Sequence, residues 1–229
     1  MTARICVSIL PKTKQEALRL IERAEDAHAD LIEVRLDCLG NHLDLAELAA
    51  HGKTPKIAAN KPLSCQGTFS GTEKERRQTL LDAAKSEFEY VDVELSTIKL
   101  GELIREVEAS GAKPIVSFHD FSGTPSSSEL NSIFEQEINS GAHVCKIVTT
   151  AKRIEDNLTV LNFTSTASVS GKARIVCFAM DELGKVSRLL SPLFGGFFTF
   201  ASLERGSETA TGQMSIQEMK AAYEVLGLK

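Results

Sequence analysis

The chain has 229 residues, of which 42% are hydrophobic, and it carries a formal net charge of −5. A chain of this length and composition can bury a large core, and the acidic balance argues against a nucleic-acid or anionic-membrane partner. No stretch approaches the roughly 18 consecutive apolar residues that a membrane span needs. The sequence shows no secretory signal, and its five cysteines lack C-x-x-C spacing. We therefore expect a cytoplasmic protein with reduced thiols.

Short β-branched runs alternate with amphipathic stretches along the whole chain. The expected strands are residues 5–9, 31–36, 56–59, 90–95, 114–118, 144–148, 174–178 and 197–200. The expected helices are residues 14–27, 45–51, 73–86, 98–110, 128–140, 154–163, 183–190 and 215–226. Such βα units, repeated about every 25 to 30 residues, are typical of a (β/α)8 TIM barrel, an α/β fold. With no Pro/Gly/Ser-rich linker, residues 1–229 are predicted to be a single domain; a doubly wound open sheet is the alternative.

Local signals mark several helix ends. Thr13 is a suitable N-cap for the first helix, and Ser110-Gly111 is a typical end for the fourth. The Ser-rich stretch before the fifth helix provides a start, with Glu129 in its first turn.

Alternation of side chains predicts which strand residues face the helices and which face the barrel interior. The apolar face is expected to pack on the helices and carries Val7, Ile32, Val34, Val91, Val93, Val116, Phe118, Ile147, Val176 and Phe198. The opposite face is expected to point inward and carries Ser8, Glu33, Arg35, Ala59, Lys61, Asp92, Glu94, Ser117, His119, Lys146, Ala179 and Thr199. Most of these polar residues sit near the carboxyl ends of their strands, where TIM barrels place active sites.

Lys146 is the strongest catalytic candidate in this set. A lysine is almost never fully buried without a partner or a function, and loss of water favours its neutral, nucleophilic form. His119 alone would more often be a hydrogen-bonded core histidine. Asp92 and Glu94 are expected to be structural partners for interior cations, and Glu33-Val34-Arg35 can form an interior ion pair.

The last third of the chain adds an arginine and a loop. Arg188 begins a helix after the seventh strand, where its guanidinium can bind a substrate carboxylate or lie at the surface. Residues 203–213 form a polar stretch with glycines, suited to a flexible lid or to an ordinary solvated loop. A phosphate cradle is weakly indicated, because the glycine spacing matches no P-loop. No H-E-x-x-H, H-x-x-E-H or cysteine cluster points to a metal site.

Several segments, in this order along nearly the whole chain, carry a resemblance to a known family. They are residues 33–37 (EVRLD), 90–95 (YVDVEL), 117–121 (SFHDF), 146–147 (KI), 187–188 (SR), 194–200 (FGGFFTF) and 209–213 (TATGQ). Together they resemble type I 3-dehydroquinate dehydratase, the Schiff-base lyase of the shikimate pathway, which leads to the aromatic amino acids. The resemblance implies a TIM barrel without cofactor or metal, often a homodimer, whose partner is its small-molecule substrate 3-dehydroquinate.

The resemblance also implies roles for individual residues. Lys146 would form the Schiff base and His119 would act as general acid and base. The residues implied in substrate binding are Ser8, Glu33, Arg35, Lys61, Arg188, Thr209 and Gln213. Glu33 and Arg35 would bind ring hydroxyls, Arg188 the carboxylate, and Thr209 and Gln213 would close over the substrate from the lid, while Ser8 would line the same pocket.

The third strand departs from the family pattern, which has an arginine followed by an acidic, glycine-rich loop. Here the stretch reads Lys61-Pro-Leu-Ser-Cys65-Gln66-Gly67. Lysine keeps the charge of arginine but loses its bidentate geometry, which affects substrate affinity and lid contacts more than the chemistry at Lys146.

Two other functions compete with the dehydratase. A class I aldolase also forms an imine on a barrel lysine, although no convincing phosphate loop follows strands seven and eight. A barrel that binds a polyhydroxy acid without turning it over is the third possibility, favoured only by the altered third-strand loop.

Overall fold

A computed structural model describes residues 3–40 and 44–228. Its strands are β1 (Ile5–Ile9), β2 (Leu31–Arg35), β3 (Lys56–Ala59), β4 (Tyr90–Glu94), β5 (Lys113–His119), β6 (Val144–Thr150), β7 (Arg174–Met180) and β8 (Thr199–Ala201). Its α-helices are α1 (Lys14–Asp26), α2 (Leu45–Ala50), α3 (Glu73–Lys85), α4 (Leu100–Ala109), α5 (Ser127–Asn139), α6 (Asp156–Ser170), α7 (Lys185–Leu190) and α8 (Ile216–Val225). Short 3-10 turns η1 (Leu36–Cys38), η2 (Leu63–Cys65), η3 (Glu182–Gly184) and η4 (Ser191–Phe194) lie between them.

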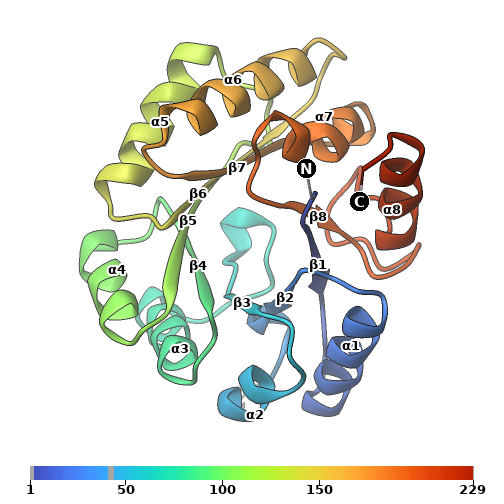
Figure 1. Ribbon diagram of the computed structural model, residues 1–229. Coiled ribbons are helices and arrows are strands. Elements are labelled where there is room, and N and C mark those ends of the chain that lie inside the picture. The colour runs from blue at the N-terminus through green and yellow to red at the C-terminus, as the bar shows by residue number, and fades with distance from the viewer. Residues whose placement is uncertain (1–2, 41–43, 229) are drawn as a thin grey trace.

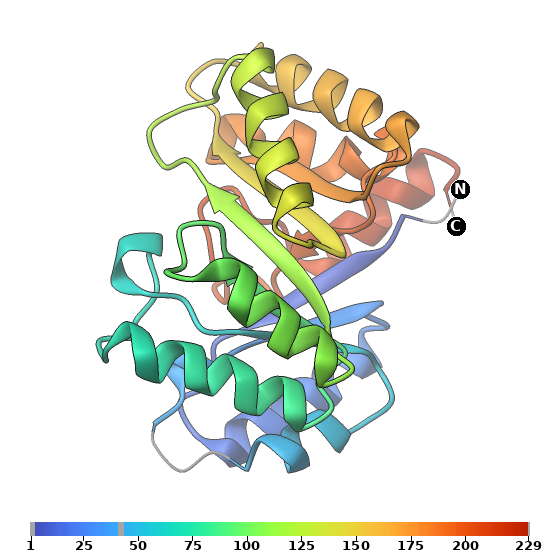
Figure 2. The same ribbon diagram turned by 90° about the vertical axis from the view of Figure 1, so that its left-hand side faces the viewer.

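The strands form a ring of parallel neighbours surrounded by the helices (Figure 1). They follow chain order from β1 to β7, and β8 pairs with β1. The ring closes where the Phe197 amide, just before β8, donates to the Ile175 carbonyl of β7 at 2.7 Å. Figure 2 shows the barrel from the side, with β5 passing between α4 and α5. The TIM barrel is confirmed and the doubly wound sheet is wrong, because strand order never reverses around the ring.

The expected helix caps are confirmed. Thr13 accepts the Glu16 amide at 3.1 Å, and α4 ends at Ser110 before Gly111, which has a positive φ of 89°. Ser126 forms a capping box with Glu129 at the start of α5. These local bonds satisfy helix-end amides that would otherwise lack partners.

Helix α6 differs most from its prediction. It extends to Ser170, seven residues beyond the expected end at Phe163. The added residues are mostly serine, threonine and valine, which favour helices weakly. They are helical here because Thr164 and Ala167 are buried against the barrel, and Thr164 also donates to the Val160 carbonyl at 2.8 Å.

The barrel interior contains an apolar layer that alternation assigned incorrectly on the last two strands. Each strand, or in β8 the residue just before it, contributes one side chain: Cys6, Leu31, Ile57, Tyr90, Ile115, Val144, Val176 and Phe198. Val176 and Phe198 therefore face inward, while Ala179 packs against α6 and Thr199 donates to the Arg188 carbonyl of α7. The prediction failed because neither strand has a charged side chain inside the barrel, so the sequence did not distinguish the interior face from the face that packs on the helices. Within the described ranges, no helix has the length and apolar character needed to cross a membrane.

Glu137 of α5 is completely buried against β6, beside the thiol of Cys145. Neither carboxylate oxygen has a hydrogen-bond partner among the described residues. Burial raises the pKa of Glu137 well above its ordinary value of 4.5, so the acid is held in its neutral form.

Glu137→Gln is expected to stabilise the protein increasingly as pH rises. Above pH 4.5 the unfolded chain ionises at this position but the folded chain does not, so the wild type loses stability until the raised folded pKa is passed. The gap between variant and wild type should widen by up to about 1.4 kcal/mol per pH unit in that window. Urea unfolding at pH 5 and pH 8 measures it, with Glu135→Gln on the same helix as the control, because Glu135 is half-exposed and pairs with Lys172 at the surface. A gap independent of pH would contradict the neutral buried acid.

Candidate active site

A cavity of about 80 Å³ opens at the carboxyl ends of the strands, between the loops after β3, β5 and β8. It is lined by Glu33, Arg35, Lys61, Cys65, Gln66, His119, Phe121, Lys146, Val148, Phe178, Met180, Arg188, Phe200, Thr209, Ala210 and Gln213. Every candidate site residue from the sequence lines it except Ser8. The structure thus brings together side chains from five strands, three loops and helix α7 at one point.

Lys146 lies on β6 with its side chain in the barrel interior and 4% of its surface exposed. Its Nζ is 2.8 Å from Asp92 Oδ2 and 3.5 Å from Glu33 Oε2. The same atom lies 4.4 Å from the centre of the Phe200 ring. The amine is therefore held by fixed neighbours and shielded from bulk water.

His119 lies at the end of β5, next to β6 in the sheet. Its Nδ1 is 3.1 Å from Glu94 Oε2, and its ring stacks on Phe121 at a centroid distance of 6.0 Å and an angle of 8°. These two contacts fix the ring plane, and the other nitrogen is left to act on a molecule in the cavity.

Lys61 joins two carboxylates beneath the cavity. Its Nζ is 2.7 Å from Asp92 Oδ1, 2.5 Å from Glu94 Oε1 and 3.2 Å from Ser117 Oγ. Burial alone would lower the pKa of Lys61, but Asp92 and Glu94 raise it above its usual range. Burial alone would likewise raise the pKa of both carboxyls, but Lys146 and Lys61 bring that of Asp92 well below normal, and His119 and Lys61 do so for Glu94. The expectation that Asp92 and Glu94 are partners of interior cations is confirmed.

Glu33 and Arg35 do not form the ion pair that the sequence allowed. Arg35 instead makes two parallel bonds of 2.7 Å to Asp37, while Glu33 Oε1 accepts from Ser8 Oγ at 2.5 Å. Burial raises the pKa of Asp37, yet Arg35 outweighs it and the pKa falls below its usual range. The sequence did not identify Asp37 as the partner of Arg35, because strand alternation applies only up to Arg35, where β2 ends. The turn η1 then directs the Asp37 carboxylate toward the Arg35 side chain. Ser8 lies below the cavity and supports Glu33.

Arg188 is the least compensated charge of the site. It is 1% exposed, and its Nε and Nη2 have no hydrogen-bond partner within the described part of the chain. The guanidinium lies over Phe178, with Cζ 4.3 Å from the ring centre, and burial lowers the pKa of Arg188 to about 9. Thr199 Oγ1 anchors the helix by donating to the Arg188 carbonyl at 2.6 Å. An open, buried guanidinium suits an anionic group entering the cavity.

The loop after β8 covers the cavity. The Thr209 amide donates to Gln213 Oε1 at 2.7 Å. The Asp181 amide, after β7, donates to the Thr211 carbonyl at 3.1 Å. Gly212 has a φ of 72°, and a side chain there would overlap the Asp181 carbonyl. These contacts form a latch between the two loops.

Sequence reasoning missed the apolar part of the site. Phe178, Met180 and Phe200 line the cavity because they share the interior face with Val176 and Phe198. With Val176 and Phe198 assigned to the interior face, alternation along each strand would have identified all three. Phe121, Cys65 and Gln66 come from loops, where alternation gives no signal.

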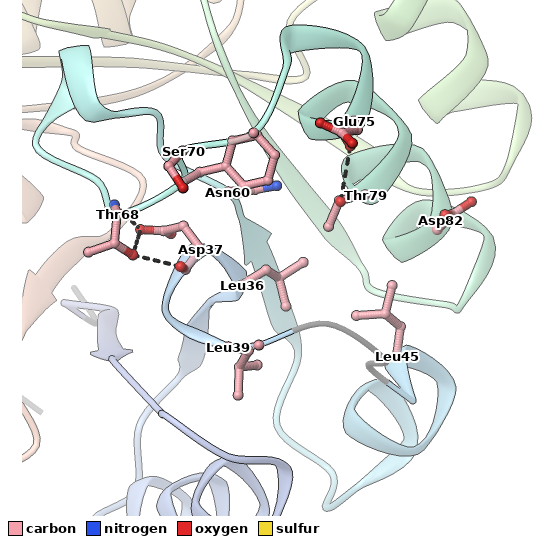
Figure 3. A pocket seen from close by; sticks show the side chains of 13 residues that line it. Leu36, Asp37, Leu39, Leu45, Asn60, Thr68, Ser70, Glu75, Thr79 and Asp82 are labelled. Carbon is pink, nitrogen blue, oxygen red and sulfur yellow. Dashed lines mark hydrogen bonds between the residues drawn. The ribbon is translucent and has the colours of Figure 1, made fainter.

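A larger cavity, of about 560 Å³, lies outside the barrel beside Asp37, Asn60 and Thr68 (Figure 3). The Thr68 amide and hydroxyl bond to Asp37 there. None of the described residues that line it is a lysine, arginine or histidine, so the groups suited to catalysis gather in the smaller cavity. In the described ranges no group of three or more His, Cys, Asp or Glu side chains is arranged to hold a metal ion.

Comparison with known proteins agrees with the geometry. A family model described as type I 3-dehydroquinase matches residues 5–229. A 3-dehydroquinate dehydratase of Dehalococcoides mccartyi is 36% identical over 219 residues, covering 96% of this chain and 94% of the relative. That of Methanothermobacter thermautotrophicus is 37% identical over 218 residues, covering 94% of each. The structure of type I 3-dehydroquinate dehydratase from Clostridium difficile with covalently modified comenic acid gives a TM-score of 0.90 at 25% identity, covering 98% of this chain and 92% of that one. The chain belongs to the type I 3-dehydroquinase family and has the 3-dehydroquinate dehydratase activity of that family.

Proposed function

We propose that this enzyme dehydrates 3-dehydroquinate to 3-dehydroshikimate through an imine on Lys146, with His119 as the general acid and base. One observation carries the proposal: a buried lysine, a histidine and an open guanidinium line the same small cavity. The covalently modified comenic acid of the Clostridium difficile relative supports covalent chemistry in this family. Because the chain belongs to this family, we set aside the two competing functions, a class I aldolase and a non-catalytic binding protein.

Substrate recognition is proposed to use charge at one end and hydroxyl contacts at the other. Arg188 would bind the carboxylate through Nε and Nη2, which have no hydrogen-bond partner among the described residues. Glu33 Oε2, buried and without a hydrogen-bond partner among the described residues, can accept from a ring hydroxyl. Arg35 lines the same wall, and Thr209 and Gln213 close it from above.

The first half of the reaction forms the imine. His119 takes a proton from the Lys146 ammonium, and the neutral amine then attacks the C3 ketone to give a carbinolamine, which loses water when His119 returns that proton to the departing hydroxyl. The resulting protonated imine carries the positive charge that Lys146 brought to its contacts with Asp92 and Glu33. These carboxylates are therefore suited to hold the cationic intermediate.

The second half eliminates water and releases the product. The protonated imine withdraws electrons and acidifies the adjacent C2–H, which His119 removes. The electron pair forms the C1–C2 double bond as the C1 hydroxyl leaves with a proton from His119. Water then hydrolyses the imine, which frees 3-dehydroshikimate and restores the amine. Each proton that His119 takes up is returned, so the cycle needs no cofactor.

Borohydride reduction during turnover tests the imine. With substrate present, reduction should inactivate the enzyme and add the mass of the reduced ligand to the peptide that contains Lys146. Without substrate, no adduct should form. An adduct on a different lysine, or full activity after reduction, would contradict the mechanism.

A homodimer and a cytoplasmic location stay predictions. An apolar surface between α7 and α8 is a candidate dimer contact. It includes Val225, which is 88% exposed, and Leu226, which is 51% exposed. If this surface joins two copies, Val225→Glu should convert a dimer to a monomer in light scattering. Val169→Glu, on α6 with 85% exposure, is the matched control. A wild-type monomer, or a variant that stays dimeric, would exclude this contact.

A further inference from the structure

The contact between His119 and Glu94 determines which imidazole nitrogen carries the proton. His119 and Lys61 hold the pKa of Glu94 below its usual range despite burial, so the carboxylate is ionised and can only accept. The 3.1 Å contact must therefore be an Nδ1–H donating to Glu94 Oε2. A neutral imidazole with its proton on Nδ1 has its lone pair on Nε2, the nitrogen needed as a base.

Lys61 has no donor left for a substrate. An ammonium group has three N–H bonds, and Lys61 has three acceptors within reach: Asp92 Oδ1, Glu94 Oε1 and Ser117 Oγ. Its side chain is 6% exposed. The sequence resemblance implied that Lys61 binds substrate, whereas the bonding around Nζ is already complete without one.

We propose that Glu94 and Lys61 are positioning residues for His119: Glu94 fixes the Nδ1–H tautomer, and Lys61 holds Glu94 in place instead of contacting substrate. The inference rests on the proposed function only in giving His119 the proton transfers.

The described part of the loop after β3 brings no carboxylate to the cavity. From this loop, Cys65 and Gln66 line the cavity beside Lys61. Burial raises the pKa of the Cys65 thiol, and Glu94 adds to the increase, so this side chain is neutral. Among the residues that the structure describes, Glu94 is the one carboxylate bonded to His119.

Lys61 also links the two catalytic side chains. Asp92 uses Oδ2 for Lys146 and Oδ1 for Lys61, and Glu94 uses Oε1 for Lys61 and Oε2 for His119. Charges alternate along this row, so each buried ion has an opposite neighbour, which offsets the cost of its burial. Removing Lys61 would leave Asp92 and Glu94 facing each other across the gap.

The tautomer can be measured in the ligand-free enzyme. Long-range ¹H–¹⁵N correlation spectra of histidine-labelled protein distinguish the two neutral forms, and His119→Asn identifies the signals by their loss. We expect the Nδ1–H form for His119. An Nε2–H form would overturn the proposal. This measurement needs no turnover, so it stands even if borohydride trapping fails and the imine mechanism is wrong.

A double-mutant cycle tests whether Glu94 acts through His119. Glu94→Gln keeps the side-chain shape but removes the anion, and it should lower kcat about 10² to 10³-fold with KM unchanged. In a His119→Ala background the same change should cause no further loss, read on the rate of imine trapping if turnover is too slow. Equal losses in both backgrounds would overturn the proposal and indicate a structural effect.

Two substitutions separate positioning from substrate binding at Lys61. Lys61→Met should lower kcat and leave KM unchanged, and Lys61→Arg should recover part of the lost kcat because it restores the cation. A raised KM with unchanged kcat in either variant would overturn the assignment. Melting curves identify a variant that fails to fold, in which case Lys61→Arg alone decides between the two outcomes.

Discussion

Replacing Lys146 with methionine is expected to abolish turnover, with kcat falling on the order of 10⁶-fold, as when another enzyme loses its nucleophile. No imine can form, so borohydride should leave the variant without an adduct. Methionine is similar in length to lysine and can pack against the Phe200 ring, while Asp92 keeps its bond to Lys61. Substrate should still bind, because Arg188 is unchanged.

Lys56 provides a matched control for this loss. It is another buried lysine, 4% exposed, and its Nζ donates to the Thr54 carbonyl at the opposite end of the strands. Lys56→Met should keep the wild-type kcat. Steady-state assays of both variants, with calorimetry for substrate binding, measure the difference. Turnover near the wild-type rate in Lys146→Met would rule out the nucleophile.

Arg188→Met is expected to weaken substrate binding and strengthen the fold at once. Losing a buried charged partner of a carboxylate costs about 2 to 5 kcal/mol, so KM should rise by about 30-fold to several thousand-fold. The ligand-free protein, however, gains by losing an uncompensated buried charge. Its Tm should rise by roughly 2 to 4 °C for each kcal/mol recovered.

A substrate analogue without the carboxylate separates this effect from general damage. Wild type should bind the analogue weakly, and Arg188→Met should bind it no worse than wild type does. Arg188→Lys keeps the charge without the planar fork and should give an intermediate KM. A lower Tm for Arg188→Met, together with an unchanged KM, would show that the guanidinium supports structure instead of binding.

Strand alternation predicted the polar half of the site and failed on the apolar half. On β5 and β6 the charged or polar side chains of His119 and Lys146 fix the inward face, and both lie where alternation puts them. On β7 and β8 both faces are apolar, so Phe178 and Phe200 were not recognised. The interior of this barrel is partly a hydrophobic layer, so hydrophobicity alone could not identify its direction.

Side-chain pairing was harder to predict than side-chain placement. Glu33 is two residues from Arg35 in the sequence, but this spacing does not determine the ion-pair partner of either side chain. The partner depends on which strand or turn lies next to β2 in the fold. Arg35 binds Asp37 because η1 folds back, and Lys61 binds Asp92 and Glu94 because β3 and β4 are neighbours in the ring. The unmet hydrogen bonds of Arg188 likewise become visible only once the surrounding helix and strands are known.

The latch between Asp181 and Thr211 closes a space of about 80 Å³, whereas occupied ligand sites usually measure about 300 to 1,000 Å³. A ligand of substrate size therefore binds only after the loop after β8 has opened. The rate of this opening then limits the rate of association. Tight inhibitors of this enzyme should accordingly show slow onset, and a brief preincubation would make them look weaker than they are.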